Sequence, residues 1–181
     1  MTDFGVMLAF IGLGSNLGDS SKVLRDAMAR MQTFSDSPIL KSSLWQTTPV
    51  DCPPGSPDFM NAVVGLVPRT GETPELLLEK LRALEQEFGR QPKKILNEPR
   101  PLDLDLIAFG SATRNSPRLI LPHPRACLRR FVLEPLSEIA PDLILPGQTK
   151  KVSQLLAELP AADSVERLDA VGPERQRRTR P

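Results

Sequence analysis

The stretch RPLDLDLIAF at residues 100–109 constrains the fold most, because it places Asp103 and Asp105 one residue apart in an apolar run. Side chains alternate between the two faces of a β-strand, so both carboxylates should lie on one face and the leucines on the other. Two carboxylates on one face repel each other unless a cation lies between them. Magnesium prefers oxygen ligands, so the spacing suits one or two ions with a nucleotide. A half-exposed strand with two solvated aspartates explains the spacing equally well.

The elements before this strand alternate between strand-like and helix-like patterns. Residues 6–13 form an apolar run of strand length, and residues 40–47 and 59–67 are further candidate strands. A helix should follow the first strand, with Asp19 or Ser20 as its cap. Its buried face should consist of Leu24, Ala27, Met28 and Met31, which recur at helical spacing.

A second helix is predicted to begin at Pro74, with Thr73 as its cap, and to end at Gly89. Its apolar stripe contains Leu77, Leu81, Leu84 and Phe88. Beyond the aspartate strand we expect a short strand at residues 118–121, a helical stretch over residues 127–141 that Pro135 starts or kinks, and a last helix at residues 152–159. This order, strand–helix–strand–strand–helix–strand and then helices, is typical of a ferredoxin-like α+β fold.

Length and charge limit the remaining possibilities. A chain of 181 residues should form one domain, which we place at residues 1–164, followed by a basic tail at residues 165–181 that we expect to be disordered. The net charge is +1, and the last nine residues contain four arginines and one glutamate, so the body is not broadly basic and should not bind nucleic acid. The apolar runs are too short for a membrane span, and Cys52 and Cys127 lack metal-binding spacing. We expect a cytoplasmic protein with reduced thiols.

The glycines of GLGSNLGD do not form a known phosphate-binding pattern. Gly12, Gly14 and Gly18 are spaced one residue too far apart for the dinucleotide fingerprint, and the chain contains no GxxxxGK[ST] motif. A strand-to-helix turn is therefore the simpler explanation of the cluster.

Cationic residues surround the aspartate strand in the sequence. Arg90, Lys93, Lys94 and Arg100 precede it, and the segment PHPRACLRR supplies His123, Arg125, Arg129 and Arg130. Cations beside a carboxylate pair are what a metal–triphosphate site requires, because guanidinium groups bind phosphate oxygens that the metal leaves free.

Several segments together resemble the 6-hydroxymethyl-7,8-dihydropterin pyrophosphokinase family of the folate pathway. They are GLGSNLGD, PDFMNAV, EQEFGR, PRPLDLDLIAFG and LPHPRACLRRFVLEPLSEIAPDLILP, and they span roughly residues 7–160. The resemblance implies a ferredoxin-like three-layer α/β/α sandwich with a central, mainly antiparallel sheet. It also implies transfer of the β,γ-diphosphate of ATP to the hydroxymethyl group of the pterin, with release of AMP and with two Mg²⁺ ions as cofactors.

The resemblance assigns roles to individual residues. Arg90 and Arg100 match catalytic-loop arginines, and Asp103 and Asp105 match the catalytic, metal-binding aspartates. The positions that match ATP contacts are Arg82, Glu85, Arg100, Leu106, Arg118, Ile120, His123 and Arg129. The positions that match pterin contacts are Thr47, Pro49, Val50, Phe59, Asn61 and Phe131.

The loop before the aspartate strand departs from the family pattern. Asn97 occupies the position of a frequent tryptophan, and Pro92 and Leu96 replace frequent arginines, so closure of this loop could differ. A metal-dependent nucleotidyltransferase is the alternative enzyme class, although it would need a third carboxylate. A non-enzymatic ferredoxin-like binding module is the third reading, and it leaves the charged cluster unexplained. Under the leading hypothesis the partners are ATP and the pterin, and we expect a monomer.

Overall fold

The computed structural model describes residues 7–49, 54–91, 99–161 and 165–168. Its main sheet is antiparallel throughout, with the strand order β5-β1-β4-β3-β8 and with β2 also paired to β4. The strands are β1 (Ala9–Ser15), β2 (Leu40–Lys41), β3 (Leu44–Thr47), β4 (Phe59–Leu66), β5 (Asp103–Phe109) and β8 (Val165–Leu168). A small hairpin of β6 (Arg114–Asn115) and β7 (Ile120–Leu121) lies apart from it.

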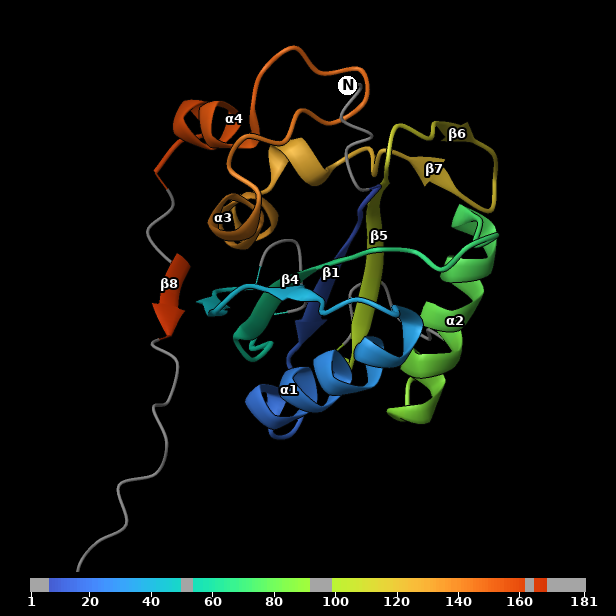
Figure 1. Cartoon of the computed structure of the whole chain (residues 1–181). Coiled ribbons are helices and arrows are strands. Elements are labelled where there is room, and N and C mark those ends of the chain that lie inside the picture. The colour runs from blue at the N-terminus through green and yellow to red at the C-terminus, as the bar shows by residue number, and fades with distance from the viewer. Residues whose placement is uncertain (1–6, 50–53, 92–98, 162–164, 169–181) are drawn as a thin grey trace, which may run out of the picture.

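Helices cover both faces of the sheet, which gives three layers (Figure 1). The first face packs against α1 (Ser20–Met31) and α2 (Pro74–Glu87), and the second against α3 (Arg130–Ile139) and α4 (Val152–Glu158). Short 3₁₀ helices, η1 (Gln32–Phe34) and η2 (Ala126–Leu128), complete the order. The arrangement confirms the predicted ferredoxin-like α/β/α fold. None of the described helices is long and apolar enough to cross a membrane.

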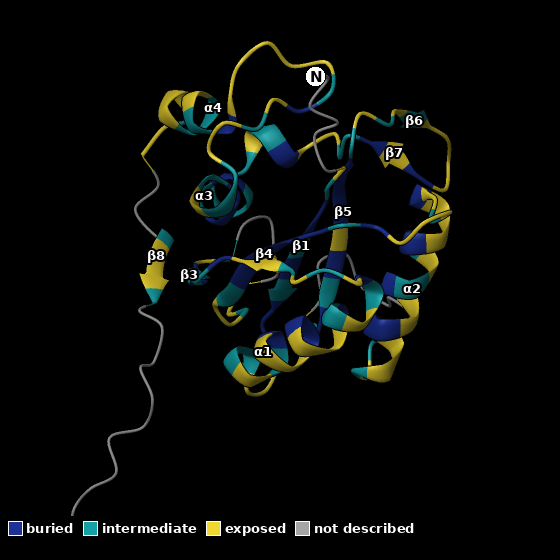
Figure 2. Ribbon diagram, in the orientation of Figure 1, coloured by how far each residue is buried: buried dark blue, intermediate teal, exposed yellow. Residues whose placement is uncertain are grey.

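Strand alternation divides the apolar residues between two cores. On β1, Ala9, Ile11 and Leu13 pack against α1 and α2, whereas Phe10 packs against α3 and α4. The central strands and the inner helix faces are buried, and the outer helix faces are exposed (Figure 2). The predicted buried face of α1, which consists of Leu24, Ala27, Met28 and Met31, is confirmed.

Both predicted helix caps are present. The Asp19 carboxylate accepts a hydrogen bond from the Lys22 backbone N–H at 3.0 Å, and the Thr73 hydroxyl accepts one from the Leu76 N–H at 3.2 Å. These bonds satisfy N–H groups that have no partner within the helix. Pro74 occupies the first turn of α2, where a missing N–H costs nothing.

Three expected elements differ from the structure. The single strand predicted over residues 40–47 is divided into β2 and β3. The Ser42 hydroxyl oxygen accepts a hydrogen bond from the Val63 N–H at 2.9 Å, and this bond interrupts the backbone ladder. The strand predicted at residues 118–121 shortens to Ile120–Leu121. Pro135 lies inside α3, whose C-terminal residue is Ile139.

Four residues of the expected basic tail belong to the sheet. β8 begins at Val165 and pairs antiparallel with β3, so that Val165 lies opposite Thr47 and Leu168 opposite Leu44. The pairing satisfies backbone groups along β3 that would otherwise be unpaired at a sheet edge. The boundary expected after residue 164 is therefore wrong for residues 165–168, and residues 169–181 lie outside the described residues.

Two neighbouring leucines on α2 test the helix packing. Leu77 is fully buried, whereas Leu76 is 48% exposed. Leu77→Ala should lower the free energy of unfolding by about 2–5 kcal/mol, because it leaves a cavity under the sheet. Leu76→Ala is the matched control and should change it by less than about 0.5 kcal/mol. Urea unfolding followed by circular dichroism measures both, and equal losses would contradict the assigned faces.

Candidate active site

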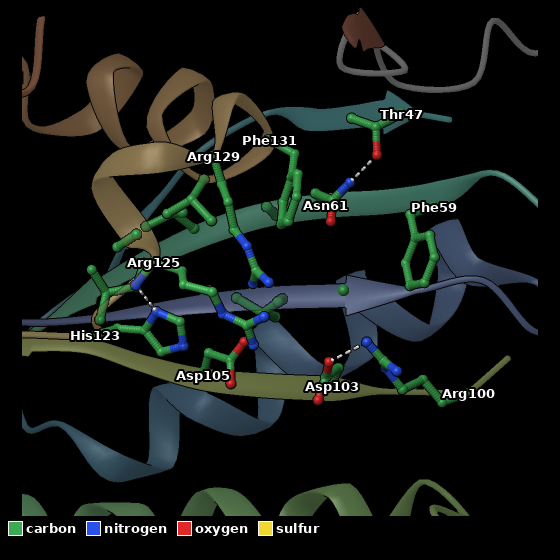
Figure 3. A pocket seen from close by; sticks show the side chains of 18 of the residues that line it. Thr47, Phe59, Asn61, Arg100, Asp103, Asp105, His123, Arg125, Arg129 and Phe131 are labelled. Atoms are coloured by element: carbon green, nitrogen blue, oxygen red, sulfur yellow. Dashed lines mark hydrogen bonds and ion pairs between the residues drawn. The ribbon is translucent and has the colours of Figure 1, made fainter. Parts of the chain in front are cut away.

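A pocket opens on the sheet face that carries α3, beside the first turn of that helix (Figure 3). Its floor comes from β1, β4 and β5, and its wall from the segment between β7 and α3. Nine of the predicted site residues line it, namely Thr47, Phe59, Asn61, Arg100, Asp103, Asp105, His123, Arg129 and Phe131. Residues far apart in the sequence therefore converge at one end of the sheet.

Asp103 and Asp105 lie on the pocket face of β5, as the alternation predicts, while Leu104 and Leu106 are buried on the other face. Arginines on both sides neutralise Asp103. Arg90 Nη1 lies 2.5 Å from Asp103 Oδ1, and Arg100 Nη2 lies 2.8 Å from Oδ2. Both carboxylate oxygens of Asp103 are thus engaged by cations.

Asp105 is exposed to the pocket, where the charges of Arg129, Arg100 and His123 act on it. Loss of hydration against the surrounding protein, followed by the negative charge of Asp103, raises the pKa of the Asp105 carboxyl. Loss of hydration also lowers the pKa of His123, although the negative charge of Asp105 acts to raise it. A bound cation would therefore stabilise the charged form of Asp105 more than it would stabilise a fully solvated carboxylate.

Glu85 supports the aspartate strand from α2. Its Oε1 accepts the Leu104 N–H at 2.7 Å and also pairs with the Arg90 guanidinium. Burial raises the pKa of the Glu85 carboxyl to about 7. Arg90 therefore bridges α2 to β5, which places its charge beside Asp103.

Two glycines of β1 leave room in the pocket because they have no side chains. Gly12 lies opposite Asp105 in the β1–β5 register, and Gly14 lies opposite Asp103 on one side and Asn61 on the other. A Cβ at Gly14 would approach Asn61 Oδ1 to 3.5 Å, so it would fill space between the amide and the aspartate. The turn explanation therefore holds only for Gly18, whose φ is +73°, and is wrong for the two glycines within β1.

The opposite end of the pocket is aromatic and amide-lined. The Asn61 side chain lies between Phe59 and Phe131 in Figure 3. Its Nδ2 donates to Thr47 Oγ1 at 2.8 Å, which fixes the orientation of the buried amide. The guanidinium of Arg100 lies 5.6 Å from the Phe59 ring centroid, and that of Arg129 lies 5.3 Å from the Phe131 centroid.

Two contributors were missed by the sequence prediction. Asn16 is buried, and its Oδ1 accepts the Arg100 N–H at 2.9 Å while its own N–H donates to the Arg100 carbonyl at 3.2 Å. It was assigned only to a turn, and nothing in its local sequence reveals a partner 84 residues away. Arg125 also lines the pocket, whereas the sequence places it only in the cationic segment before α3.

Other predicted residues lie outside this pocket. Arg82 on α2 donates to the Arg118 carbonyl at 3.4 Å, so these two residues and Ile120 form a group beside α2 and β7. The Leu106 side chain is buried in the core with α1 and α2. Pro49 does not line the pocket, and Val50, Pro92, Lys93, Lys94, Leu96 and Asn97 lie outside the described residues.

The charged side chains of the pocket suit a metal cation that is itself bound to an anion. Two carboxylates face the pocket one residue apart, while Arg100 Nε is buried without a hydrogen-bond partner in the described part of the chain. An unpaired buried guanidinium N–H is costly and calls for an acceptor such as a phosphate oxygen. The described residues hold no group of three or more His, Cys, Asp or Glu side chains placed for a metal, so the third carboxylate of a nucleotidyltransferase is not among them.

Comparison with known proteins agrees with this geometry. The family model for 7,8-dihydro-6-hydroxymethylpterin-pyrophosphokinase matches residues 10–141. The 2-amino-4-hydroxy-6-hydroxymethyldihydropteridine pyrophosphokinase of Synechocystis is 38% identical over 151 residues, which cover 83% of this chain and 75% of the relative. The enzyme of that name from Pseudomonas aeruginosa is 35% identical over 164 residues, covering 90% and 98%.

Solved structures show the same fold. A crystal structure of an HPPK-DHPS protein in complex with substrates matches with a TM-score of 0.66 at 11% identity, covering 83% of this chain and 43% of that chain. A Plasmodium falciparum HPPK-DHPS variant also gives 0.66, at 12% identity, covering 86% and 44%. This chain thus spans less than half of each fused protein. The family match and the relatives show that the chain belongs to the 7,8-dihydro-6-hydroxymethylpterin-pyrophosphokinase family.

Proposed function

We propose that this protein uses ATP and Mg²⁺ to transfer a diphosphate to 6-hydroxymethyl-7,8-dihydropterin. The hydroxymethyl oxygen attacks the β-phosphorus, the bond from that phosphorus to the α-phosphate oxygen breaks, and AMP leaves as the hydroxyl proton is lost. The observation that carries the proposal is the buried, unpaired Arg100 Nε beside the Asp103–Asp105 pair. A metal–triphosphate group would supply a phosphate oxygen as acceptor for Arg100 and a metal cation for the two carboxylates.

The charged end of the pocket would hold the triphosphate. Asp103 and Asp105 would hold two Mg²⁺ ions, which when bound neutralise phosphate oxygens and polarise the reacting phosphorus. Asn16 holds the Arg100 backbone and Asp103 pairs with its guanidinium, while Glu85 and Asp103 pair with Arg90, which supports a role for both arginines here. Their role is to stabilise the charge that moves to the bridging oxygen. His123 and Arg129 would contact the remaining phosphate oxygens.

The aromatic end of the pocket would hold the pterin. Phe59 and Phe131 flank the Asn61 amide, and a flat heteroaromatic ring between them gains offset-stacking energy. Because Thr47 fixes the Asn61 amide, its oxygen and remaining N–H face the slot in a set orientation. Pro49 and Val50 are assigned to pterin binding by the family resemblance alone.

The nucleotide base would lie toward α2 and β7. Arg82, Glu85, Arg118 and Ile120 lie on these elements or on the segment just before β7. Leu106 would contribute through its main chain, since its side chain is buried on the other sheet face. We further propose a cytoplasmic monomer that acts on these small molecules, with residues 1–168 as the catalytic domain.

The direct test is product analysis. The protein is incubated with ATP, Mg²⁺ and the pterin, and products are separated by chromatography and identified by mass. AMP and pterin diphosphate in equal amounts are the expected products. ADP, or nucleotide hydrolysis that does not depend on the pterin, would refute the proposal.

Asp105→Asn tests the metal role. The amide keeps the size of the side chain but removes the negative charge, so kcat should fall by at least about a hundredfold. Asp142→Asn removes an exposed carboxylate that pairs with Lys151 and is the matched control. Its kcat should equal that of the wild type. Similar kcat values for both variants would show that Asp105 holds no essential cation.

Arg100→Lys tests the unpaired guanidinium nitrogen. Lysine keeps the charge beside Asp103 but lacks the planar set of donors that includes Nε. We expect kcat to fall about a hundredfold with a much smaller change in KM for ATP, since the group acts mainly on the charge that develops in the transition state. A rise in KM at unchanged kcat would assign Arg100 to ground-state binding instead. Steady-state kinetics at saturating pterin separates the two results.

A further inference from the structure

The last turn of α3 is tied to β3 by one carboxylate. Glu138 Oε2 accepts the Ser43 N–H at 3.0 Å and the Trp45 indole N–H at 3.2 Å, and Glu138 Oε1 accepts the Ser43 hydroxyl at 2.7 Å. Arg167 of β8 pairs with Oε1 at 3.2 Å and also donates to the Ser43 hydroxyl oxygen at 3.0 Å. We call Glu138, Ser43, Trp45 and Arg167 the α3–β3 clamp.

This network is more than a surface ion pair. The Glu138 side chain is only 24% exposed, and its two oxygens receive four protein donors. Burial raises the pKa of this carboxyl, but the Ser43 and Trp45 hydrogen bonds outweigh it and leave the pKa below its usual value. Hydrogen bonds to a charged acceptor are stronger than those between neutral groups, so the clamp holds the two elements at a defined separation.

Both elements joined by the clamp reach the pterin end of the pocket. Phe131 lies in the first turn of α3, two turns before Glu138. Thr47 lies two residues beyond Trp45 on β3, hence on the same strand face, and it orients the Asn61 amide. The clamp therefore fixes the aromatic wall relative to the amide that faces it.

At its first turn α3 is tied to α4, because Arg130 Nη1 donates to the Leu156 carbonyl at 3.3 Å. Pro135 removes one backbone donor from within the helix, so the clamp is the polar tie of its last turn to the sheet. The segment before α3 is anchored separately, because the His123 N–H donates to the Ile107 carbonyl on β5 at 2.8 Å. A change in the clamp should therefore move Phe131 more than it moves the proposed phosphate contacts.

We propose that Glu138 is a positioning residue for the pterin, which acts through α3 and β3 to set the spacing between Phe131 and the Thr47–Asn61 pair. The proposal rests on the proposed function, since it assumes that a pterin fills this slot. Glu138 itself lies outside the lining of the pocket.

Glu138→Gln is the main test, because it keeps the shape but turns one acceptor oxygen into a donor that faces other donors. The KM for the pterin should rise about tenfold, while the KM for ATP should stay within about twofold. Glu134→Gln is the matched control on the same helix: its side chain is 21% exposed and pairs with Arg130. It should leave both KM values unchanged.

Two further measurements separate positioning from general stability. Trp45 is the single tryptophan of the chain, so its emission maximum should shift in Glu138→Gln and not in Glu134→Gln. Of the bonds to Glu138, Ser43→Ala removes only the hydroxyl bond to Oε1, so it should raise the pterin KM by less than Glu138→Gln does. The double variant should be no worse than Glu138→Gln alone, because that bond is already altered in the single variant. Additive effects would show that the two residues act separately and would contradict the clamp.

The outcomes are distinguishable from those of the proposed function. If Glu138→Gln only lowers the melting temperature, or raises both KM values equally, the positioning role is refuted. If the wild type binds the pterin in calorimetry without forming AMP, the proposed reaction fails, and the pterin Kd of the variants then tests the clamp in place of KM. If the wild type binds no pterin, both proposals are refuted.

Discussion

Asp103 and Asp105 can lie on one face of β5 because two arginines pair with Asp103 and offset its charge. Arg90 approaches from the end of α2 and Arg100 from the segment before β5, and each pairs with a different oxygen of Asp103. Their placement depends in turn on Glu85, which binds both Arg90 and the β5 backbone, and on Asn16, which binds the Arg100 backbone. The network joins α2, β5 and the turn after β1 around a single charged group, and it leaves Asp105 open to the pocket.

The sheet makes this charged face compatible with a stable core. Side chains that point toward α1 and α2 form one continuous apolar cluster. The opposite sheet face can therefore carry polar side chains where β1 and β5 border the pocket. Glycine at positions 12 and 14 leaves that area low, and α3 covers only part of it. The same alternation that buries Leu104 and Leu106 therefore points the aspartates into the concave pocket.

Local patterns predicted most of the fold, because helix periodicity, caps and strand alternation are properties of neighbouring residues. The buried face of α1, the cap at Thr73 and the shared face of Asp103 and Asp105 follow from such patterns. The division of β2 from β3 was missed because it depends on a hydrogen bond that the Ser42 hydroxyl accepts from Val63, 21 residues away. The pairing of β8 with β3 and the contacts of Asn16 and Glu138 were missed for the same reason.

The candidate site was predicted in part by chemistry and in part by resemblance. The carboxylate pair and its cationic neighbours indicated an anion and a metal, but spacing alone left a solvated strand equally possible. The aromatic pair and Asn61 had no local signal of a shared pocket, and it is the β1–β4 register that places Asn61 beside Gly14. The glycine cluster was wrongly assigned to a turn because the two-residue spacing of Gly12 and Gly14 is strand spacing, which gains meaning only opposite the aspartates.

The central claim is that the Asp103–Asp105 face binds divalent ions together with a triphosphate. Mn²⁺ titration followed by electron paramagnetic resonance tests it directly, with α,β-methylene-ATP as a nucleotide that cannot be cleaved at the reacting bond. The account predicts that the nucleotide increases the number of tightly bound Mn²⁺ ions in the wild type, and that this increase is lost when Asp103 and Asp105 are both replaced by asparagine. An equal number of bound ions in the two proteins would contradict it.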